Sequence, residues 1–439
     1  MIYTLSGSAG SWARRTAVSV LALTLAAAVP SATAFAQATP EVAASAPAPS
    51  LSLDDALRRA VLADPARAGF EARSRAADAG VRQAGVRPNP TVGMMVDNLP
   101  TLGGGDMLGR TETTFSYEQR LERGGDRDAR IGIARGESAL LVTRARVARL
   151  DRIEAVQVAW GEALAAQARV EIARERLGLA RGFRDEVKRR VDAARDPLFA
   201  GSRADAEVAQ AQIDYDQAQI EARVALINLA RYWNGRVDFS LTATLFEDTS
   251  AANKAAGEVA EDDLAVFAAQ KGVALAQVRL EQARAVPDPT VSVGIRHLWD
   301  SEVSLVFGGS IPLQRYDQNR AAIERAQAEG IAADADLEAF RIDRDREIAR
   351  LQVRLLAKAS EARRIAQETI PRAETAVVQV RDGFGRGGFT YNDVMAAHTA
   401  LLEARARRVA VLEEFHILRA RLDRLTGAHS GLIGLETEQ

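Results

Sequence analysis

Cysteine is absent from this sequence of 439 residues, and proline and aromatic residues are scarce. Without a thiol the chain can form no disulfide bond, carry no lipid on a cysteine and offer no thiolate to a soft metal ion. A charge excess is also missing, since 57 Lys and Arg residues stand against 59 Asp and Glu residues. That balance argues against a nucleic-acid partner, which would require a basic face.

Long apolar runs are missing as well, except for a short one near the N-terminus. Arg14 and Arg15 precede an apolar run at 17–29, and the small residues around Phe35 follow it. This pattern predicts a secretory signal peptide at 1–36 that is cleaved after about Ala36, although an uncleaved anchor is an alternative. Because no later segment approaches 18 uncharged apolar residues, a membrane-spanning part would have to be a β-barrel.

Much of the remaining sequence has a helical pattern. Residues 37–51 are rich in Ala, Pro and Ser and predict a flexible leader. Ser52 and Asp55 then mark the start of a helix that we expect to reach about Val86. After Gly125 a helical pattern continues to about Arg195, which at 1.5 Å per residue corresponds to roughly 105 Å. We expect a return helix from about Ser202 to Tyr232, ended by Asn234 and Gly235.

Two short segments between these helices have the alternation of strands instead. Near 90–120, Thr113, Phe115 and Tyr117 alternate with more polar residues after a Gly-rich turn, which predicts a β-hairpin with one apolar face.

The same plan is repeated in the second half of the chain. Pro287-Asp288-Pro289 echoes Pro88-Asn89-Pro90, and a second hairpin at about 289–313 is followed by a long helix from about Asn319 to Asp382. A Gly-rich break and a return helix ending at Gly427 complete the unit. The sequence therefore divides into a signal peptide at 1–36, a leader at 37–51, a first repeat at 52–235 with a tip at about 195–203, a linker at 236–261, a second repeat at 262–427 with a tip at about 383–392, and a tail at 428–439.

Four strands from one chain cannot close a barrel, and an open sheet edge within a bilayer would leave unpaired backbone groups. Three copies would supply twelve strands, each of suitable length to span the membrane. The charged helices cannot lie in lipid and must project from it. The fold class that we predict is therefore mainly α with a small β part: a homotrimer with a 12-stranded outer-membrane β-barrel continued by a long periplasmic α-helical barrel.

The duplicated unit, the signal peptide and the Gly breaks together resemble the TolC-type outer-membrane efflux family. Two further stretches, 87–98 and 119–130, are similar to the CzcC-type branch of that family. This resemblance implies an outer-membrane channel in a tripartite efflux system, which would export divalent heavy-metal cations with a periplasmic membrane-fusion adaptor protein and a proton-driven inner-membrane RND pump. Its barrel would contact outer-membrane lipid.

The resemblance also implies roles for the two breaks, which would be periplasmic tips that close the pore and meet the adaptor. Asp393 matches a position where the family places a pore-lining aspartate, and Asp205 is its counterpart in the first repeat. A nearby basic position of the family corresponds to Phe389, which implies a more apolar gate. A simpler interpretation is that both carboxylates stabilise helix N-termini. The residues implied in docking are Asp196, Pro197, Gly201, Gly385, Gly387 and Gly388.

No pattern in the sequence predicts a catalytic site, a cofactor site or a metal site. The four histidines do not fall at ligand spacing on one helix face, and no serine lies in a nucleophile-elbow motif. Alternatives to metal efflux are the same duct used for drug efflux or for type I protein secretion. A periplasmic coiled-coil scaffold without a pore is an alternative of another class, although it leaves the two hairpins unexplained.

Overall fold

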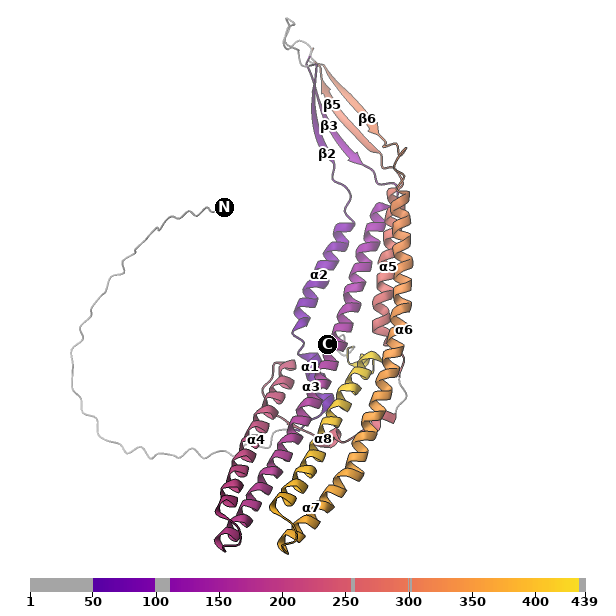
Figure 1. Cartoon of the computed structure of the whole chain (residues 1–439). Coiled ribbons are helices and arrows are strands. Elements are labelled where there is room, and N and C mark those ends of the chain that lie inside the picture. The colour runs from indigo at the N-terminus through magenta and orange to yellow at the C-terminus, as the bar shows by residue number, and fades with distance from the viewer. Residues whose placement is uncertain (1–49, 99–110, 254–256, 299, 301, 434–439) are drawn as a thin grey trace, which may run out of the picture. The chain divides into compact units, whose positions relative to one another are not determined.

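A computed structural model describes residues 50–98, 111–253, 257–298, 300 and 302–433 (Figure 1). The signal peptide expected at 1–36, most of the leader and the turn of the first hairpin lie outside these residues. The last two residues assigned to the leader, Ser50 and Leu51, form strand β1. It pairs in parallel with β4, Ser240–Leu241, and Leu51 is buried in the core.

The two hairpins form one antiparallel sheet of four strands. Strands β2 (Thr91–Asp97) and β3 (Glu112–Arg120) come from the first repeat, and β5 (Thr290–His297) and β6 (Val303–Ser310) come from the second. The strand order is β2-β3-β5-β6, so that β3 and β5 join the two repeats. Within this sheet the outer edges of β2 and β6 have no partner strand.

One face of the sheet is apolar and exposed. Val92 pairs with Tyr117, Tyr117 with Val293 and Val293 with Phe307, which gives a continuous apolar row across all four strands. A second row is formed by Met94, Phe115, Ile295 and Leu305, and every member of both rows is more than 40% exposed. This confirms the apolar face expected from the alternation in 112–118.

Four helices continue from the sheet in the same order as its strands (Figure 1). Helix α3 (Asp126–Asp192) contacts α2 (Ala66–Ala84) on one side and α5 (Glu261–Arg284) on the other, and α5 contacts α6 (Arg320–Arg364). The 67 residues of α3 correspond to about 100 Å of helix. The long helix expected after Gly125 is thus confirmed.

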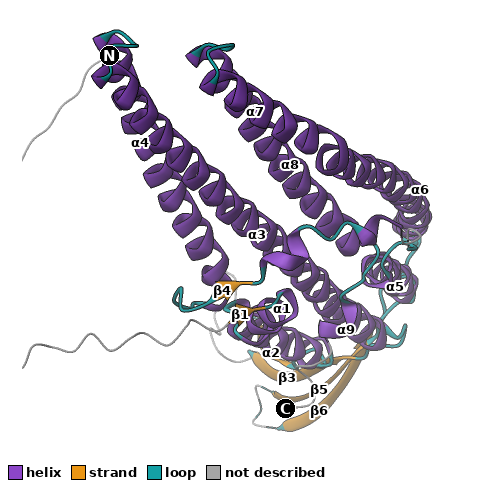
Figure 2. Ribbon diagram, turned by 90° about the horizontal axis from the view of Figure 1, so that it is seen from below, coloured by secondary structure: helices purple, strands orange, loops and turns teal. Residues whose placement is uncertain are grey.

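Away from the sheet each repeat ends in a helical hairpin, and Figure 2 shows the two hairpins next to each other. Helix α3 pairs with α4 (Leu198–Ala230), and α7 (Ile370–Gly385) pairs with α8 (Tyr391–Leu425), which also contacts α3. A 3-10 turn at Arg231–Trp233 follows α4. Asn234, with φ of 53°, adopts the left-handed conformation expected near this helix end, and Gly235 does not.

The helix expected from Ser52 to about Val86 is wrong as a single element. It is divided into α1 (Leu53–Leu62) and α2, because Pro65 has no N–H for the helical ladder. Asp64 fills the gap by accepting a hydrogen bond from the Ala66 N–H at 3.0 Å. The predicted start is confirmed, since Ser52 Oγ accepts a hydrogen bond from the Asp55 N–H at 3.2 Å.

The long helix of the second repeat also departs from a regular α-helix. A π-helical turn at Ile365–Thr369 separates α6 from α7, and Pro371 lies at the start of α7. Pro371 has no N–H to donate to the regular helical hydrogen-bond pattern. The wider π turn directly before it accommodates this missing hydrogen bond. The sequence-based expectation of one uninterrupted helix from Asn319 missed this adjustment.

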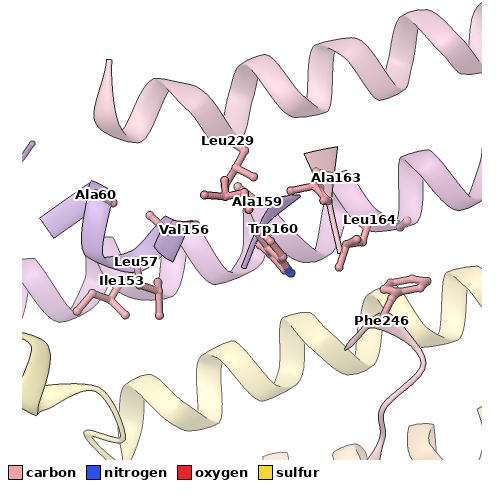
Figure 3. Close-up of a cluster of buried hydrophobic side chains, with 14 of the residues drawn as sticks. Leu57, Ala60, Ile153, Val156, Ala159, Trp160, Ala163, Leu164, Leu229 and Phe246 are labelled. Atoms are coloured by element: carbon pink, nitrogen blue, oxygen red, sulfur yellow. The ribbon is translucent and has the colours of Figure 1, made fainter. Parts of the chain in front are cut away.

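The main core lies where α1, α3, α4 and the linker meet (Figure 3). Leu57 of α1, Trp160 of α3 and Leu229 of α4 are nearly inaccessible to solvent. Phe246, from a 3-10 turn at Ala243–Phe246, covers the same cluster. The described residues of the segment 236–261 are therefore part of the packed structure, as is α9 (Ser430–Ile433) of the tail, which contributes the buried Ile433. A further 3-10 turn occupies Ser250–Asn253.

The junction between the sheet and the helices links the two repeats. Asp288 lies between Pro287 and Pro289, and its side chain is 4% exposed. It accepts hydrogen bonds from the Arg120 side chain at 2.9 Å and from the Arg123 N–H at 2.9 Å. Gly124 is required here because a Cβ atom would lie 2.1 Å from the Ala283 carbonyl oxygen. The stretch 119–130 thus has a structural role in this junction.

Candidate gate and docking site at the helical tips

The first tip is the turn between α3 and α4. Ala194 has a φ of 54°, a left-handed conformation that ends α3. Asp196 forms an ion pair with Arg190 at 2.8 Å, and Pro197 is the N-cap residue of α4. Because α4 begins at Leu198, Gly201 lies within the helix and not in the turn where the sequence had placed it. Pro197 fits the position at which a helix starts. No neighbouring atom requires a glycine at position 201, because a Cβ there would meet nothing within 4 Å.

The second tip is the turn between α7 and α8, and it is closed by glycine. Gly385 is the last residue of α7, and Gly387, with a φ of 81°, makes the left-handed turn. The Gly388 N–H donates to the Gly383 carbonyl oxygen at 2.8 Å. Phe389 is 46% exposed, and its ring lies against Gly383.

Asp393 stabilises the start of α8. Its Oδ2 accepts hydrogen bonds from the Thr390 N–H and from the Thr390 hydroxyl, both at 2.7 Å, and its own N–H donates to Thr390 Oγ1 at 3.4 Å. These hydrogen bonds hold the pKa of the Asp393 carboxyl below its ordinary value. The carboxylate is therefore a helix-capping group in this structure, and its exposure leaves it open to solvent as well.

Asp205 is exposed and lies two turns inside α4, outside its first turn. The interpretation of Asp205 as an N-terminal helix residue is therefore wrong. Among the described residues, no hydrogen bond or ion pair joins Asp205 to Asp393.

Aromatic side chains connect the two tips. The ring of Phe183 in α3 lies 4.5 Å from the ring of Tyr391 and 5.9 Å from that of Phe384, measured between centroids. Arg190 and Arg203 lie over the rings of Phe384 and Tyr391 at 4.6 and 5.2 Å. Burial raises the pKa of the Tyr391 hydroxyl. Such cation–π and edge-to-face contacts hold the two hairpins together at their ends.

The sequence did not single out two apolar residues at the first tip. Leu198 is 82% exposed and Phe199 is 70% exposed, next to Pro197. An apolar pair directly after a helix break was visible in the sequence, but its exposure depends on the packing of the hairpin. Together with Phe389 these side chains give the tips an accessible apolar character, as a docking surface requires.

Within the described part of the chain, no group of three or more His, Asp and Glu side chains is arranged to hold a metal ion. No helix among the described residues is long and apolar enough to span a membrane.

This architecture is that of a known class of channel. The structure superimposes on VceC, an outer membrane protein of Vibrio cholerae, with a TM-score of 0.64 at 20% sequence identity, over 85% of this chain and 96% of VceC. The mainly helical fold with one small sheet is thereby confirmed as the fold of outer-membrane channels of the TolC type.

The sequence comparisons agree with the fold. Residues 259–428 match the family described as outer membrane efflux protein. It is 27% identical to the cobalt-zinc-cadmium resistance protein CzcC of Cupriavidus metallidurans, over 80% of this chain and 84% of CzcC. It is 29% identical to the nickel and cobalt resistance protein CnrC of the same species, over 65% of this chain and 69% of CnrC. The resemblance to the CzcC-type branch is confirmed.

Proposed function

We propose that this protein is the outer-membrane channel of a tripartite, proton-driven RND-type efflux system and a passive conduit for divalent heavy-metal cations. The names of CzcC and CnrC, with cobalt, zinc, cadmium and nickel in them, support this cargo. The chain itself carries out no catalysis in this proposal. Selection of the ion belongs to the inner-membrane pump, since tight binding along the duct would hinder conduction.

The apolar face of the four-stranded sheet is the observation that carries the channel function. Phe307 is 77% exposed and Val92 is 78% exposed, and both belong to a row that crosses the whole sheet. The opposite face carries polar groups, including Arg296, which donates to Thr114 Oγ1 at 3.1 Å. A sheet with these two faces fits lipid on one side and an aqueous lumen on the other. A periplasmic scaffold without a pore would give no reason for a sheet with one exposed apolar face and one polar face.

The unpaired edges of the sheet support assembly into a homotrimer. Strands β2 and β6 are the outer strands, and their free N–H and C=O groups can be satisfied in a bilayer only by another copy. Three copies joined edge to edge would place twelve strands around one axis. The helices, which follow the same order as the strands, would then line a continuous passage below the sheet.

In this assembly the tips would be the gate and the adaptor-docking surface. Asp393 and Phe389 of three copies would lie close to the axis, with Asp205 nearby on the other hairpin. A ring of ionised Asp393 carboxylates would bind cations and restrict the opening. The turn residues Asp196, Pro197, Gly385, Gly387 and Gly388, with Gly201 in the first turns of α4, would shape the surface that meets the adaptor. The exposed Leu198 and Phe199 would add apolar contact area.

The decisive experiment is deletion of the gene, followed by growth tests with zinc, cadmium, cobalt, nickel and copper and with a panel of antibiotics. We expect increased sensitivity to one or more of the metals, and restoration by the wild-type gene. Sensitivity to antibiotics alone would replace metal efflux by drug efflux. A soluble periplasmic monomer in fractionated cells would exclude the channel altogether.

A further inference from the structure

The most exposed large apolar side chains among the described residues lie in the loop between β6 and α6. Within this border loop, residues 311–316, Leu313 is 90% exposed and Tyr316 is 92% exposed. Ile311 at its start is exposed as well. A cluster of exposed apolar side chains on a folded chain marks a surface that contacts another molecule.

The border loop is fixed in position by hydrogen bonds. The Gln314 side chain donates to the Arg284 carbonyl oxygen at 3.2 Å, and the Asn319 side chain donates to the Glu281 carbonyl oxygen at 2.7 Å. Both acceptors lie near the end of α5. Asp317 accepts a hydrogen bond from the Asn319 N–H at 2.9 Å and thereby closes the turn before α6. The loop therefore presents its apolar side chains in a defined position.

The border loop continues the apolar face of the sheet. On β6 this face consists of odd-numbered residues, and Ile311 and Leu313 continue the odd-numbered series. On β3 the face is continued by the exposed Leu121, whose N–H donates to the Pro289 carbonyl oxygen at 2.9 Å and extends the ladder with β5. The apolar face thus reaches beyond the strands to the point where the charged helices begin.

The length of this extended face fits a bilayer. Leu313 follows Val303 by ten residues (313 − 303 = 10), which corresponds to about 34 Å of extended chain. In strands tilted by about 35–45° this is roughly 24–28 Å across the membrane, close to the apolar band of outer-membrane barrels. Leu313 would then lie at one border of the band, and Tyr316 beside it is a residue typical of such borders.

Two arginines without a carboxylate partner lie at the same border. The guanidinium of Arg315 is 5.6 Å from the ring centroid of Tyr316. The exposed Arg123 is held close by, since its N–H donates to Asp288 Oδ1 at 2.9 Å. Arg120 has an ion pair with Asp288, whereas the side chains of Arg123 and Arg315 form none within the described part of the chain. The border therefore has positive charge that an anion could neutralise.

A second copy of the chain would leave the border loop uncovered. It would join β6 through the unpaired N–H and C=O groups of the strand edge, which lie in the plane of the sheet. Side chains of the apolar face stand roughly perpendicular to that plane, so they would remain on the outside of the assembly. Lipid chains suit the apolar side chains, and a phosphate suits the arginines.

We propose that the border loop binds an anionic phospholipid in the leaflet that faces the periplasm, an inference that rests on the proposed channel function. Ile311 and Leu313 would contact the acyl chains, and the ring of Tyr316 would lie at the level of the ester groups. The guanidinium of Arg315, already placed over this ring, would donate to the phosphate, with Arg123 as a second cation. Such a site would fix the height at which each copy lies in the membrane.

Because the chain has no cysteine, single labels can be attached without removing native thiols. Full-length Leu313→Cys, Phe307→Cys and Leu198→Cys, each carrying a nitroxide, are reconstituted in vesicles of phosphatidylglycerol and phosphatidylcholine. Leu198 is the matched control, since it is also apolar and highly exposed but lies at the far tip. We expect collision with a water-soluble nickel chelate to be at least fivefold lower at 307 and 313 than at 198, and collision with oxygen to be higher.

The position of the label that is reached by the chelate separates the two proposals. Protection at 307 with full access at 313 would refute the border site and leave the channel function intact. Full access at both positions would remove the lipid contact of the sheet, on which the channel function itself depends.

The preference for an anionic headgroup is tested by native mass spectrometry of protein released from vesicles with equal amounts of the two lipids. We expect the wild type to retain phosphatidylglycerol at least threefold over phosphatidylcholine, and Arg315→Gln to lose most of this preference. Arg325→Gln is its control, because Arg325 is an exposed arginine of α6 that pairs with Glu329. Equal retention of the two lipids by the wild type would overturn the proposal, as would an unchanged preference in Arg315→Gln.

Discussion

The ring of Phe389 lies against the backbone of Gly383, so closely that a Cβ atom at position 383 would be 2.2 Å from Phe389 Cδ2. Gly383→Ala must therefore displace the ring and disturb the turn at the second tip. We expect a loss of about 1–3 kcal/mol in the stability of this region, as for other overpacked sites. Faster limited proteolysis between α7 and α8 would report it.

Gly385→Ala is the matched control for this substitution, because a Cβ at Gly385 meets no atom within 4 Å. Its proteolysis should be unchanged or slower than that of the wild type. If both variants are cleaved at the same rate, the contact between Phe389 and Gly383 does not hold the turn.

A second prediction concerns the charge of Asp393. If three Asp393 carboxylates surround the pore, Asp393→Ala should raise single-channel conductance in planar bilayers and weaken block by divalent cations. The same substitution also removes a helix cap. Thr390→Ala separates the two effects, since it removes the hydrogen bond that Thr390 Oγ1 donates to Asp393 Oδ2 and the one that it accepts from the Asp393 N–H, but keeps the carboxylate. Wild-type conductance and block in Asp393→Ala would contradict the role in the pore.

The capping role of Asp393 has its own dependence on pH. The hydrogen bonds from Thr390 lower the pKa of this carboxyl in the folded protein below the ordinary value of 3.8. Its stabilisation of α8 is therefore fully present above about pH 3.8 and is lost as the pH falls through the lower folded-state pKa. Between pH 5 and 8 neither this contribution nor the block by divalent cations should change. A change of block within this range would point to another titrating group.

The third prediction concerns a buried ion pair that joins the end of α8 to the start of α5. Arg424 donates to both carboxylate oxygens of Asp263 at 2.7 and 2.9 Å, and the two side chains are 8% and 9% exposed. Despite its burial, hydrogen bonds from Arg424 to Asp263 and Asp151 raise the pKa of the guanidinium. Arg424→Met leaves the Asp263 carboxylate buried and unpaired, which should cost about 3–5 kcal/mol.

Thermal unfolding followed by circular dichroism would measure this loss. Arg67→Met provides the comparison, because Arg67 and Glu71 form an exposed pair within α2 whose removal should cost less than about 1 kcal/mol. Similar melting temperatures for the two variants would mean that the Arg424 pair adds no more than a surface contact.

The fourth prediction tests the apolar face of the sheet. Phe307→Lys places a charge where we propose lipid, at a cost of about 2–4 kcal/mol near the middle of the membrane. We expect less trimer in the outer-membrane fraction. Ser292→Lys is the control on the opposite face, where Glu118 is the cross-strand neighbour of Ser292. A Phe307→Lys protein that assembles as well as the control would exclude lipid contact at this position.

The sequence by itself determined the elements that depend on local chemistry. The helical period after Gly125, the alternation around Phe115 and the repeated Pro-x-Pro motif were sufficient to predict long helices, hairpins and a duplicated unit. The helix cap at Ser52 could also be predicted from the sequence, because its partner Asp55 is only three residues away. Two prolines, Pro65 and Pro371, interrupt helices that the pattern alone suggested were continuous.

Only the tertiary structure decided the relationships between distant residues. The pairing of β3 with β5 and the ring contact of Phe183 with Tyr391 join the two repeats, and the bond between Arg424 and Asp263 joins the two ends of the second repeat. Local propensity is silent about such contacts, because they depend on which face each helix presents to its neighbours. For the same reason the sequence could place Asp393 at the start of a helix, whereas its hydrogen bonds with Thr390 became visible only in the folded chain.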